Sequence, residues 1–124
     1  MLRECGRVLE PGGRIAGYVI HPPAGLTPSQ ERRAAELGPS DVTAPASPAA
    51  LTESAGLTIV VIEDVTDAFR ATCVALRAAR RDLDAELRGD EGDEFYEEAL
   101  RTKDAMLCGI DEGVLCRSLI VAKK

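Results

Sequence analysis

The sequence predicts an α/β protein with an open sheet whose strands are joined by helices. Two charge-free apolar runs, at residues 15–20 and 57–62, have the length of strands buried on both faces of a parallel sheet. The stretch between them carries helix-capping signals and is long enough for a crossover. A strand–helix–strand order with a long crossover favours a parallel arrangement of these two strands.

The N-terminal segment predicts a helix followed by the first strand. Apolar residues recur at helical spacing over residues 2–9, and the Pro-Gly-Gly sequence at 11–13 stops the helix. The first strand is expected at residues 14–20. It ends at His21, because the prolines that follow cannot donate hydrogen bonds to a sheet ladder.

Two helices are expected between the strands. Thr27 and Gln30 fit a capping box around a proline at the first helical position. This helix should run to about Leu37, with Gly38 as a left-handed C-terminal cap. A loop over 39–48 follows, and a second short helix then begins at Ser47-Pro48 and is ended by Gly56.

The second strand, expected at 57–62, leads into a predicted helix pair at 67–108. Gly89 is expected to end the first helix of the pair. Gly109 and Gly113 mark a turn into the final strand, expected at 115–122, which is free to pair antiparallel after the helix pair.

Composition narrows the function classes. The 124 residues are a common length for one domain, and the net charge of −6 repels phosphate backbones, so no nucleic-acid partner is expected. No run approaches the roughly 20 apolar residues of a membrane helix, and the N-terminus lacks the apolar block of a signal peptide. We therefore expect a cytoplasmic protein without a membrane contact.

The cysteines and the acidic tract do not predict a metal site. No two cysteines have CxxC spacing, and His21 is the only histidine. We interpret all four cysteines as buried thiols; a catalytic thiol at Cys108 or Cys116 stays open, although no histidine lies near either in the sequence. The acidic tract at 90–98 does not fit a calcium loop, and we expect a solvated turn there, with Asp93 or Glu94 starting a helix.

Three segments carry a family resemblance. LRECGRVLEPGGRIAGYVI resembles the part of class I S-adenosylmethionine-dependent methyltransferases in which a helix, read roughly as L-R-E-x-x-R-V-L-x-P-G-G, precedes the fifth strand. LTESAGLTIVVIEDVT resembles the helix, Ala-Gly turn and sixth strand of that fold. EGVLCRSLIVAKK resembles its closing strand, which inserts antiparallel between strands five and six.

The resemblance implies that residues 1–124 form a single partial methyltransferase domain. Its fold would be the C-terminal half of a Rossmann-like sheet, with three strands, the last one antiparallel, flanking helices and a helix-pair insertion. The implied function is transfer of a methyl group to a small-molecule acceptor. Met1 looks like an internal methionine, so we expect the chain to begin inside the domain, through truncation or a misplaced start.

The implied cofactor is S-adenosylmethionine, which in this family sits on a glycine-rich turn after the first strand. Gly12-Gly13 does not match that turn, because the pair precedes a strand instead of following one. We expect no cofactor-binding residues in this chain. S-adenosylmethionine would bind in a complete domain, and the chain alone would be inactive.

Two further hypotheses remain open. The chain is alternatively a short non-catalytic interaction module that covers its exposed strand edge by forming a homodimer or by joining a separately encoded N-terminal half. Because an uncovered apolar edge strand favours aggregation, a soluble monomer would count against this alternative. The other hypothesis, an unrelated small α/β binding protein, requires all three segments to be coincidental.

The candidate catalytic residues are His21 and Asp64, because ligands of open parallel sheets lie outside the carboxyl ends of the strands. A histidine with an ordinary pKa of about 6.5 suits proton removal from a methyl acceptor, although His21 also simply ends a strand. Asp64 is a candidate for orienting an acceptor hydroxyl or amine, or for capping the helix that begins there.

The candidate substrate contacts come from the same end of the sheet. An antiparallel last strand would bring its beginning, Cys116 and Arg117, to this end, where Arg117 would meet an anionic substrate group or form a surface ion pair. Helices over the crevice would add aromatic rings, and Thr66 favours a helix cap. The candidate set is His21, Thr66, Phe69, Tyr96 and Arg117.

Overall fold

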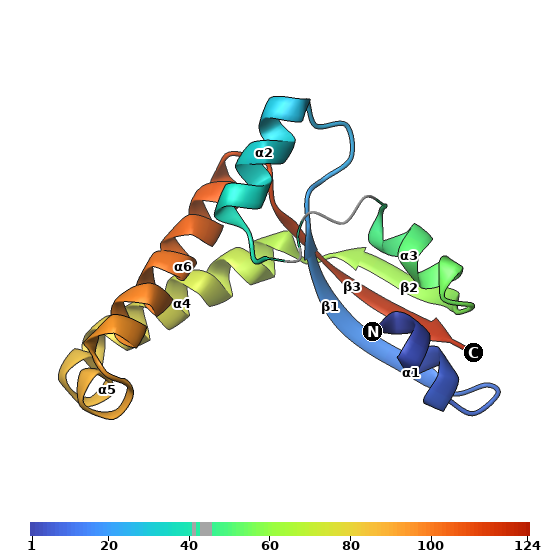
Figure 1. The fold of residues 1–124 in the computed structure, drawn as a ribbon, viewed down its shortest axis with the longest axis horizontal. Helices are drawn as coiled ribbons and strands as arrows, with labels where there is room; N and C mark the ends of the chain where they lie inside the picture. Colours follow the sequence, from blue (N-terminus) through green and yellow to red (C-terminus); the bar gives the residue numbers. More distant parts are fainter. Residues whose placement is uncertain (41, 43–45) are drawn as a thin grey trace.

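The computed structural model describes residues 1–40, 42 and 46–124. Figure 1 shows one sheet with short helices beside it and a long helical arm projecting from one end. In chain order the elements are α1 (Leu2–Val8), β1 (Arg14–His21), α2 (Pro28–Leu37), α3 (Pro48–Ser54), β2 (Thr58–Asp64), α4 (Thr66–Asp82), α5 (Asp84–Glu91), α6 (Asp93–Asp111) and β3 (Cys116–Lys123).

The sheet has the strand order β1-β3-β2, and β3 runs antiparallel to both neighbours. The strands β1 and β2 are therefore parallel to each other, as the sequence predicted. The predicted insertion of the last strand between them is confirmed. Its register places Tyr18 opposite Leu119 and Ile62 opposite Ile120, with an irregularity in β2 between Ile59 and Val61.

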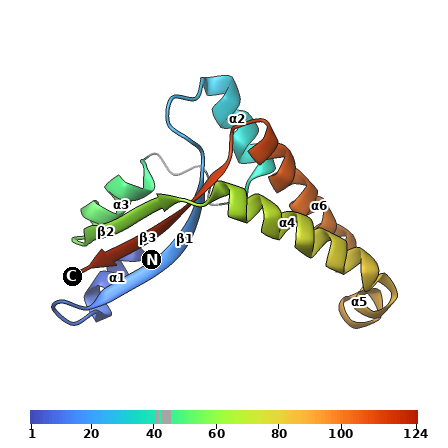
Figure 2. The ribbon, with the colours of Figure 1, turned by 180° about the vertical axis from the view of Figure 1, so that it is seen from behind.

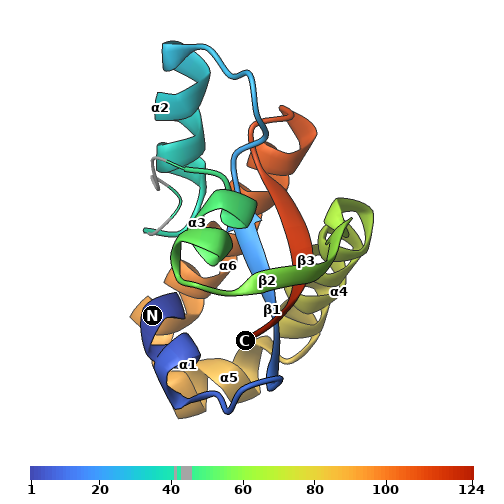
Figure 3. The ribbon, with the colours of Figure 1, turned by 90° about the vertical axis from the view of Figure 1, so that its right-hand side faces the viewer.

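The two faces of the sheet differ in what packs on them. The helices α1 and α3 lie on one face, called here the covered face (Figure 3). On β3, Ser118, Ile120 and Ala122 point to the covered face and are buried. The opposite, open face carries Ala16, Tyr18, Val61, Leu119 and Val121.

The open face remains accessible to solvent. Tyr18 is 61% exposed and Val61 is 41% exposed. The expectation that both apolar runs are buried on both faces is therefore wrong for the described residues. The reason is that α4 meets β3 near the carboxyl ends of β1 and β2 and then runs away from the sheet (Figure 2), so most of this face is not packed by it.

The predicted helix pair is three helices, because the break positions differ from those expected. Gly89 lies inside α5 and does not end a helix. The first break falls at Leu83, and the second at Gly92, whose φ of +87° favours glycine. The last helix begins at Asp93, as predicted. Phe69, Cys73 and Met106 form the small apolar core where α4 packs on α6.

The capping box of α2 is confirmed. The Thr27 hydroxyl accepts from the Gln30 N–H, and the Gln30 side chain accepts from the Thr27 N–H at 2.9 Å. The expected left-handed cap at Gly38 is wrong, since its backbone is extended (φ −89°, ψ 172°). Glycine is needed there for space, because a Cβ would lie 2.9 Å from both Ala34 O and Val42 Cγ2. Residues 41 and 43–45 of the predicted loop lie outside the described residues.

Candidate functional site

The carboxyl ends of β1 and β2 meet the beginning of β3 at one edge of the sheet. Because β1 ends at His21, β2 ends at Asp64 and β3 begins at Cys116, the topology brings polar residues from three distant parts of the chain together. Figure 1 shows this edge where the helical arm joins the sheet.

His21 is held by two hydrogen bonds on the covered face. Its Nδ1 lies 2.9 Å from the carbonyl oxygen of Pro22, and its Nε2 lies 2.8 Å from the Ser118 hydroxyl. A carbonyl oxygen only accepts, so Nδ1 carries the proton and Nε2 accepts from the hydroxyl of Ser118. The ring is therefore oriented with its basic nitrogen on a buried serine.

Cys116 lies against the same imidazole. Its Sγ is 3.5 Å from Nδ1 and 3.6 Å from Nε2 of His21, and the thiol donates to the His21 carbonyl at 3.2 Å. Burial, and secondarily the charge of Asp64, raises the pKa of Cys116 to about 11. This histidine is 95 positions away in the sequence, so the fold brings to the thiol a neighbour that the local sequence does not contain. Even so, the thiol stays protonated at neutral pH, which does not favour a nucleophile.

The four cysteines differ in burial. Cys73 is buried, but Cys5, Cys108 and Cys116 are each half-buried, so the interpretation of all four as buried thiols holds for Cys73 alone. Cys108 donates to Glu112, and this hydrogen bond, followed by burial, raises the pKa of its thiol.

Asp64 and Thr66 join β2, α4 and β3. The Thr66 N–H donates to the Asp64 carboxylate at 2.8 Å, and the Thr66 hydroxyl accepts from the Arg117 N–H at 3.1 Å. Hydrogen bonds from Thr66, with a smaller contribution from the charge of His21, lower the pKa of Asp64. Thr66 is the first residue of α4 and not its N-cap, which is Val65. This geometry agrees with the helix-starting role considered for Asp64.

Arg117 lies on the other side of the sheet from His21. Its guanidinium carbon is 4.0 Å from the ring centre of Tyr18 and 5.0 Å from that of Phe69. Tyr18 belongs to the open face, whereas His21 and Ser118 belong to the covered face. The structure thus divides the strand-end candidates between two faces, with Arg117 and Phe69 on one and His21 on the other.

Tyr96 is not brought to this edge. It lies in the first turn of α6, at the end of the arm that is distant from the sheet (Figures 1 and 2), and its side chain is fully buried. Its hydroxyl donates to the Arg80 carbonyl at 2.9 Å, and the Arg88 guanidinium lies 4.3 Å from its ring centre. These contacts give it a packing role in the arm.

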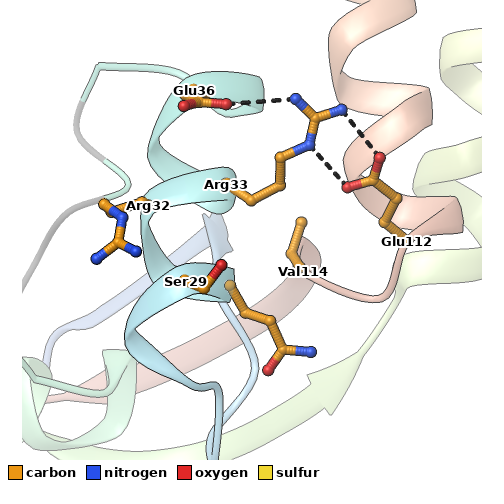
Figure 4. Close-up of a pocket in the computed structure, with 7 residues that line it drawn as sticks. Ser29, Arg32, Arg33, Glu36, Glu112 and Val114 are labelled. Carbon is orange, nitrogen blue, oxygen red and sulfur yellow. Dashed lines mark hydrogen bonds and ion pairs between the residues drawn. The ribbon is translucent and has the colours of Figure 1, made fainter.

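A separate hollow of about 380 Å³ lies between α2 and the end of α6 (Figure 4). Arg33 spans it, donating two hydrogen bonds of 2.9 Å to Glu112 and one of 3.3 Å to Glu36. Its guanidinium is thereby occupied by carboxylates. None of the strand-end candidates lines this hollow, and its ion pairs fasten α2 to α6.

The described residues contain neither a metal-binding cluster nor a helix suited to a membrane. Within the ranges 1–40, 42 and 46–124, no three His, Cys, Asp or Glu side chains are grouped so as to hold a metal ion. Over the same part of the chain, no helix has the length and apolar character needed to cross a membrane.

Sequence reasoning missed two residues that define the site. Ser118 donates to Nε2 of His21 and so orients its ring, and Tyr18 forms one wall beside Arg117. Both follow from the register of β3 against β1, which pairs residues about a hundred positions apart. The alternation of side chains along β3 was a usable signal, because residues two positions apart in a strand lie on the same face of the sheet.

Solved structures with this fold are methyltransferases and related enzymes. The chain matches a protein assigned as a sarcosine dimethylglycine methyltransferase from Galdieria sulphuraria, with a TM-score of 0.75 and 19% identity, over 99% of this chain and 46% of that one. It matches phosphoethanolamine N-methyltransferase 2 from Haemonchus contortus, solved with phosphomonomethylethanolamine and S-adenosylhomocysteine. That match has a TM-score of 0.75 and 14% identity, over 99% of this chain and 29% of that one. The match to the cyclopropane synthase MmaA2 from Mycobacterium tuberculosis has a TM-score of 0.71 and 13% identity, over 99% of this chain and 48% of that one.

These likenesses define the fold. No protein-family profile matches the chain, and no curated protein matches it. The chain spans less than half the length of each of these three structures. The chain shares its fold with part of the domain of these methyltransferases, and its strand arrangement is the one predicted for the C-terminal half of such a domain.

Proposed function

We propose that the chain forms the C-terminal part of an S-adenosylmethionine-dependent methyltransferase that acts on a small-molecule acceptor. The observation that carries the proposal is the antiparallel insertion of β3, which collects His21, Asp64 and Arg117 at the carboxyl edge of the sheet. Open α/β sheets bind their ligands outside this edge. The shared fold with solved methyltransferases supports the reaction class.

Within this proposal, His21 is the residue suited to accept a proton from the methyl acceptor. Its Nε2 is the unprotonated nitrogen and accepts a hydrogen bond from Ser118, so it takes a proton from the acceptor only when the Ser118 hydroxyl rotates away from it. Asp64 and Thr66 position the beginning of α4 against β3. Arg117 would contact the acceptor and the buried Phe69 would hold its guanidinium, whereas the burial of Tyr96 in the distant arm favours a structural role.

The described residues do not fit S-adenosylmethionine. Its adenosine needs a strand that passes through a glycine-rich turn into a helix, but β1 continues into Pro22-Pro23, and β2 passes through Val65 directly into α4. We therefore propose that the chain alone does not bind this cofactor and is inactive, and that binding requires a complete domain. The four free cysteines support the further proposal of a cytoplasmic protein, since reducing compartments keep thiols free.

The first experiment measures cofactor binding by titration calorimetry. The chain alone is compared with a chimera in which it replaces the matching 46% of the Galdieria protein. The proposal expects no saturable binding of S-adenosylmethionine by the chain and restored binding by the chimera. Tight binding by the chain alone would contradict the proposed inactivity, and a folded chimera that does not bind the cofactor would contradict the methyltransferase assignment.

The second candidate function is a non-catalytic interaction module. The observation that favours it is the exposed apolar surface of the open face and of β2, where Tyr18, Val61 and Ile62 are accessible. Such surface suits a homodimer or a separately encoded N-terminal half that completes the sheet. Sedimentation of the purified chain distinguishes the cases, because a stable monomer at high concentration would argue against a homodimer.

A further inference from the structure

Arg117 differs from the ion-paired arginines of the described residues. Those that pair with carboxylates are Arg7, Arg33, Arg70, Arg77, Arg80, Arg88 and Arg101. Arg117 donates its backbone N–H to Thr66, but in the part of the chain that the structure describes no acceptor lies against its guanidinium. Its side-chain donors are thus available to a ligand.

Two aromatic rings hold this guanidinium in place. Phe69 is buried in the core between α4 and α6, so its ring is a fixed wall, and Tyr18 on the open face is the second contact. Stacking on aromatic faces restrains the side chain while leaving its N–H groups directed outward. A restrained guanidinium with free donors is the usual receptor for a two-oxygen anion.

The carboxylates of α6 do not compete for this guanidinium. Burial raises the pKa of the Cys73 thiol, and the positive charges of Lys103 and Arg117 oppose that shift. Two acidic groups of α6 are already engaged: Asp111 pairs with Arg70 at 2.8 Å, and Asp104 pairs with Arg77 at 2.5 Å. Neither carboxylate is therefore available to the guanidinium of Arg117.

Glu63 is the competing partner to consider. The register pairs it with Leu119, which places it on the open face of the neighbouring strand, diagonal to Arg117. Among the ion pairs of the described residues, none joins the two side chains. The guanidinium of Arg117, a half-buried residue, lies against the exposed ring of Tyr18 instead.

We propose that Arg117, between Tyr18 and Phe69, is an oxyanion subsite that binds a carboxylate or a phosphate group of a small molecule. This inference rests on the proposed function in one respect: it makes the bound anion a part of the methyl acceptor. The acceptor class is then a small molecule with a methylatable atom and a carboxylate or phosphate group.

The test uses the full chain labelled with ¹⁵N-arginine and follows the Nε–H signals by NMR. Inorganic phosphate and acetate are added in separate titrations at constant ionic strength. The Arg117→Lys variant assigns the Arg117 signal. Arg32 serves as the matched reference, because it is exposed and the described residues give it no aromatic contact.

The expected result is a saturable shift of the Arg117 signal, with a dissociation constant on the order of 1–10 mM, a range suited to a single guanidinium–oxyanion contact. Saturation by phosphate alone indicates a phosphorylated ligand, by acetate alone a carboxylate, and by both a shared subsite. Tyr18→Leu should weaken binding several-fold. A non-saturating shift equal to that of Arg32 would overturn the proposal. A shift of Arg117 in Glu63→Gln without any added anion, showing that Glu63 already occupies the guanidinium, would do so too.

This experiment is independent of the test of the proposed function, because it needs neither S-adenosylmethionine nor turnover. A saturable Arg117 signal with a folded chimera that does not bind the cofactor would leave the subsite intact and refute the methyltransferase assignment. A chimera that binds the cofactor, with an Arg117 signal that does not respond, would refute the subsite alone.

Discussion

Replacing Gly109 by alanine should destabilise the protein, although alanine normally favours a helix. Gly109 lies in the last turn of α6, and a Cβ built there would be 2.8 Å from Leu115 Cγ and closer still to Cδ1. Leu115 is almost fully buried in the cluster with Ala34, Val42 and Val114, so it has no space into which to move. This contact fixes the corner between α6 and β3 that leads to Cys116 and Arg117.

The magnitude follows from two opposing contributions. Removing a glycine from a helix gains at most about 1 kcal/mol, and overpacking a closed core costs about 1–3 kcal/mol. The net loss expected for Gly109→Ala is therefore roughly 0–3 kcal/mol. Leu115→Ala alone should cost about 2–5 kcal/mol. In the double variant the new methyl group enters the vacated space, so Gly109→Ala should then stabilise, giving a coupling of about 1–3 kcal/mol.

The assay is urea denaturation of the four proteins of this cycle, with Gly89→Ala as the matched control. Gly89 also lies near the end of a helix, and a Cβ there would meet nothing within 4 Å. The control should stabilise by up to about 1 kcal/mol whether or not Leu115 is present. An equal effect of Gly109→Ala in both backgrounds would show that the contact with Leu115 does not control the corner.

Three further predictions address the candidate residues. Tyr96→Phe should lower the free energy of unfolding by about 1 kcal/mol, because it removes the hydrogen bond to the Arg80 carbonyl. The shift of the Arg117 NMR signal on adding anion should stay unchanged, and a loss of that shift would contradict the structural role of Tyr96. Because the pKa of Cys116 is raised to about 11, its thiol should react with iodoacetamide at pH 8 about 10²-fold more slowly in the folded protein than in urea. Mass spectrometry measures the two labelling rates, and equal rates would refute the burial of this thiol. Since the pKa of Asp64 is lowered, its stabilising contribution is full above about pH 4 and is lost at lower pH. Asp64→Asn should therefore make Tm fall less steeply as the pH is lowered through this range, and an unchanged slope of Tm against pH would contradict this.

The strands could be predicted closely because local signals mark their ends. The strand expected at 14–20 is observed as Arg14–His21, the one expected at 57–62 as Thr58–Asp64, and the one expected at 115–122 as Cys116–Lys123. Prolines and glycines interrupt the chain beside each apolar run, and their effects on the backbone do not depend on distant residues. The capping box at Thr27 is local in the same sense.

The burial of the strands could not be predicted from the sequence, because it depends on what packs against them. An apolar run such as residues 57–62 is compatible with a face covered by a helix and with a face left open. The break at Leu83 likewise reflects how α5 turns to pack on α6, which no glycine or proline at that position announces. Gly89 gave the wrong signal, since an isolated glycine is tolerated inside a helix at modest cost.

For the candidate site, the edge of the sheet at which a residue lies could be predicted, but the face on which it lies could not. Chain order and strand direction were enough to place His21, Asp64 and Arg117 at one edge of the sheet. The face that each occupies depends on the pairing of β1 with β3, and a shift of one residue would have exchanged the two faces. Ser118 and Tyr18 therefore became visible only with the register.

The division of the candidates between two faces restricts where an acceptor can bind. A molecule confined to the open face would meet Arg117 and Tyr18 but would leave His21, on the covered face, without a role. A ligand that contacts both His21 and Arg117 must instead lie across the end of β1, beyond Ile20, which is paired with Arg117 in the sheet. That position is the crevice outside the carboxyl ends of the strands. Anion binding at Arg117 therefore supports the subsite, but His21 becomes a base only for a ligand long enough to reach around this end.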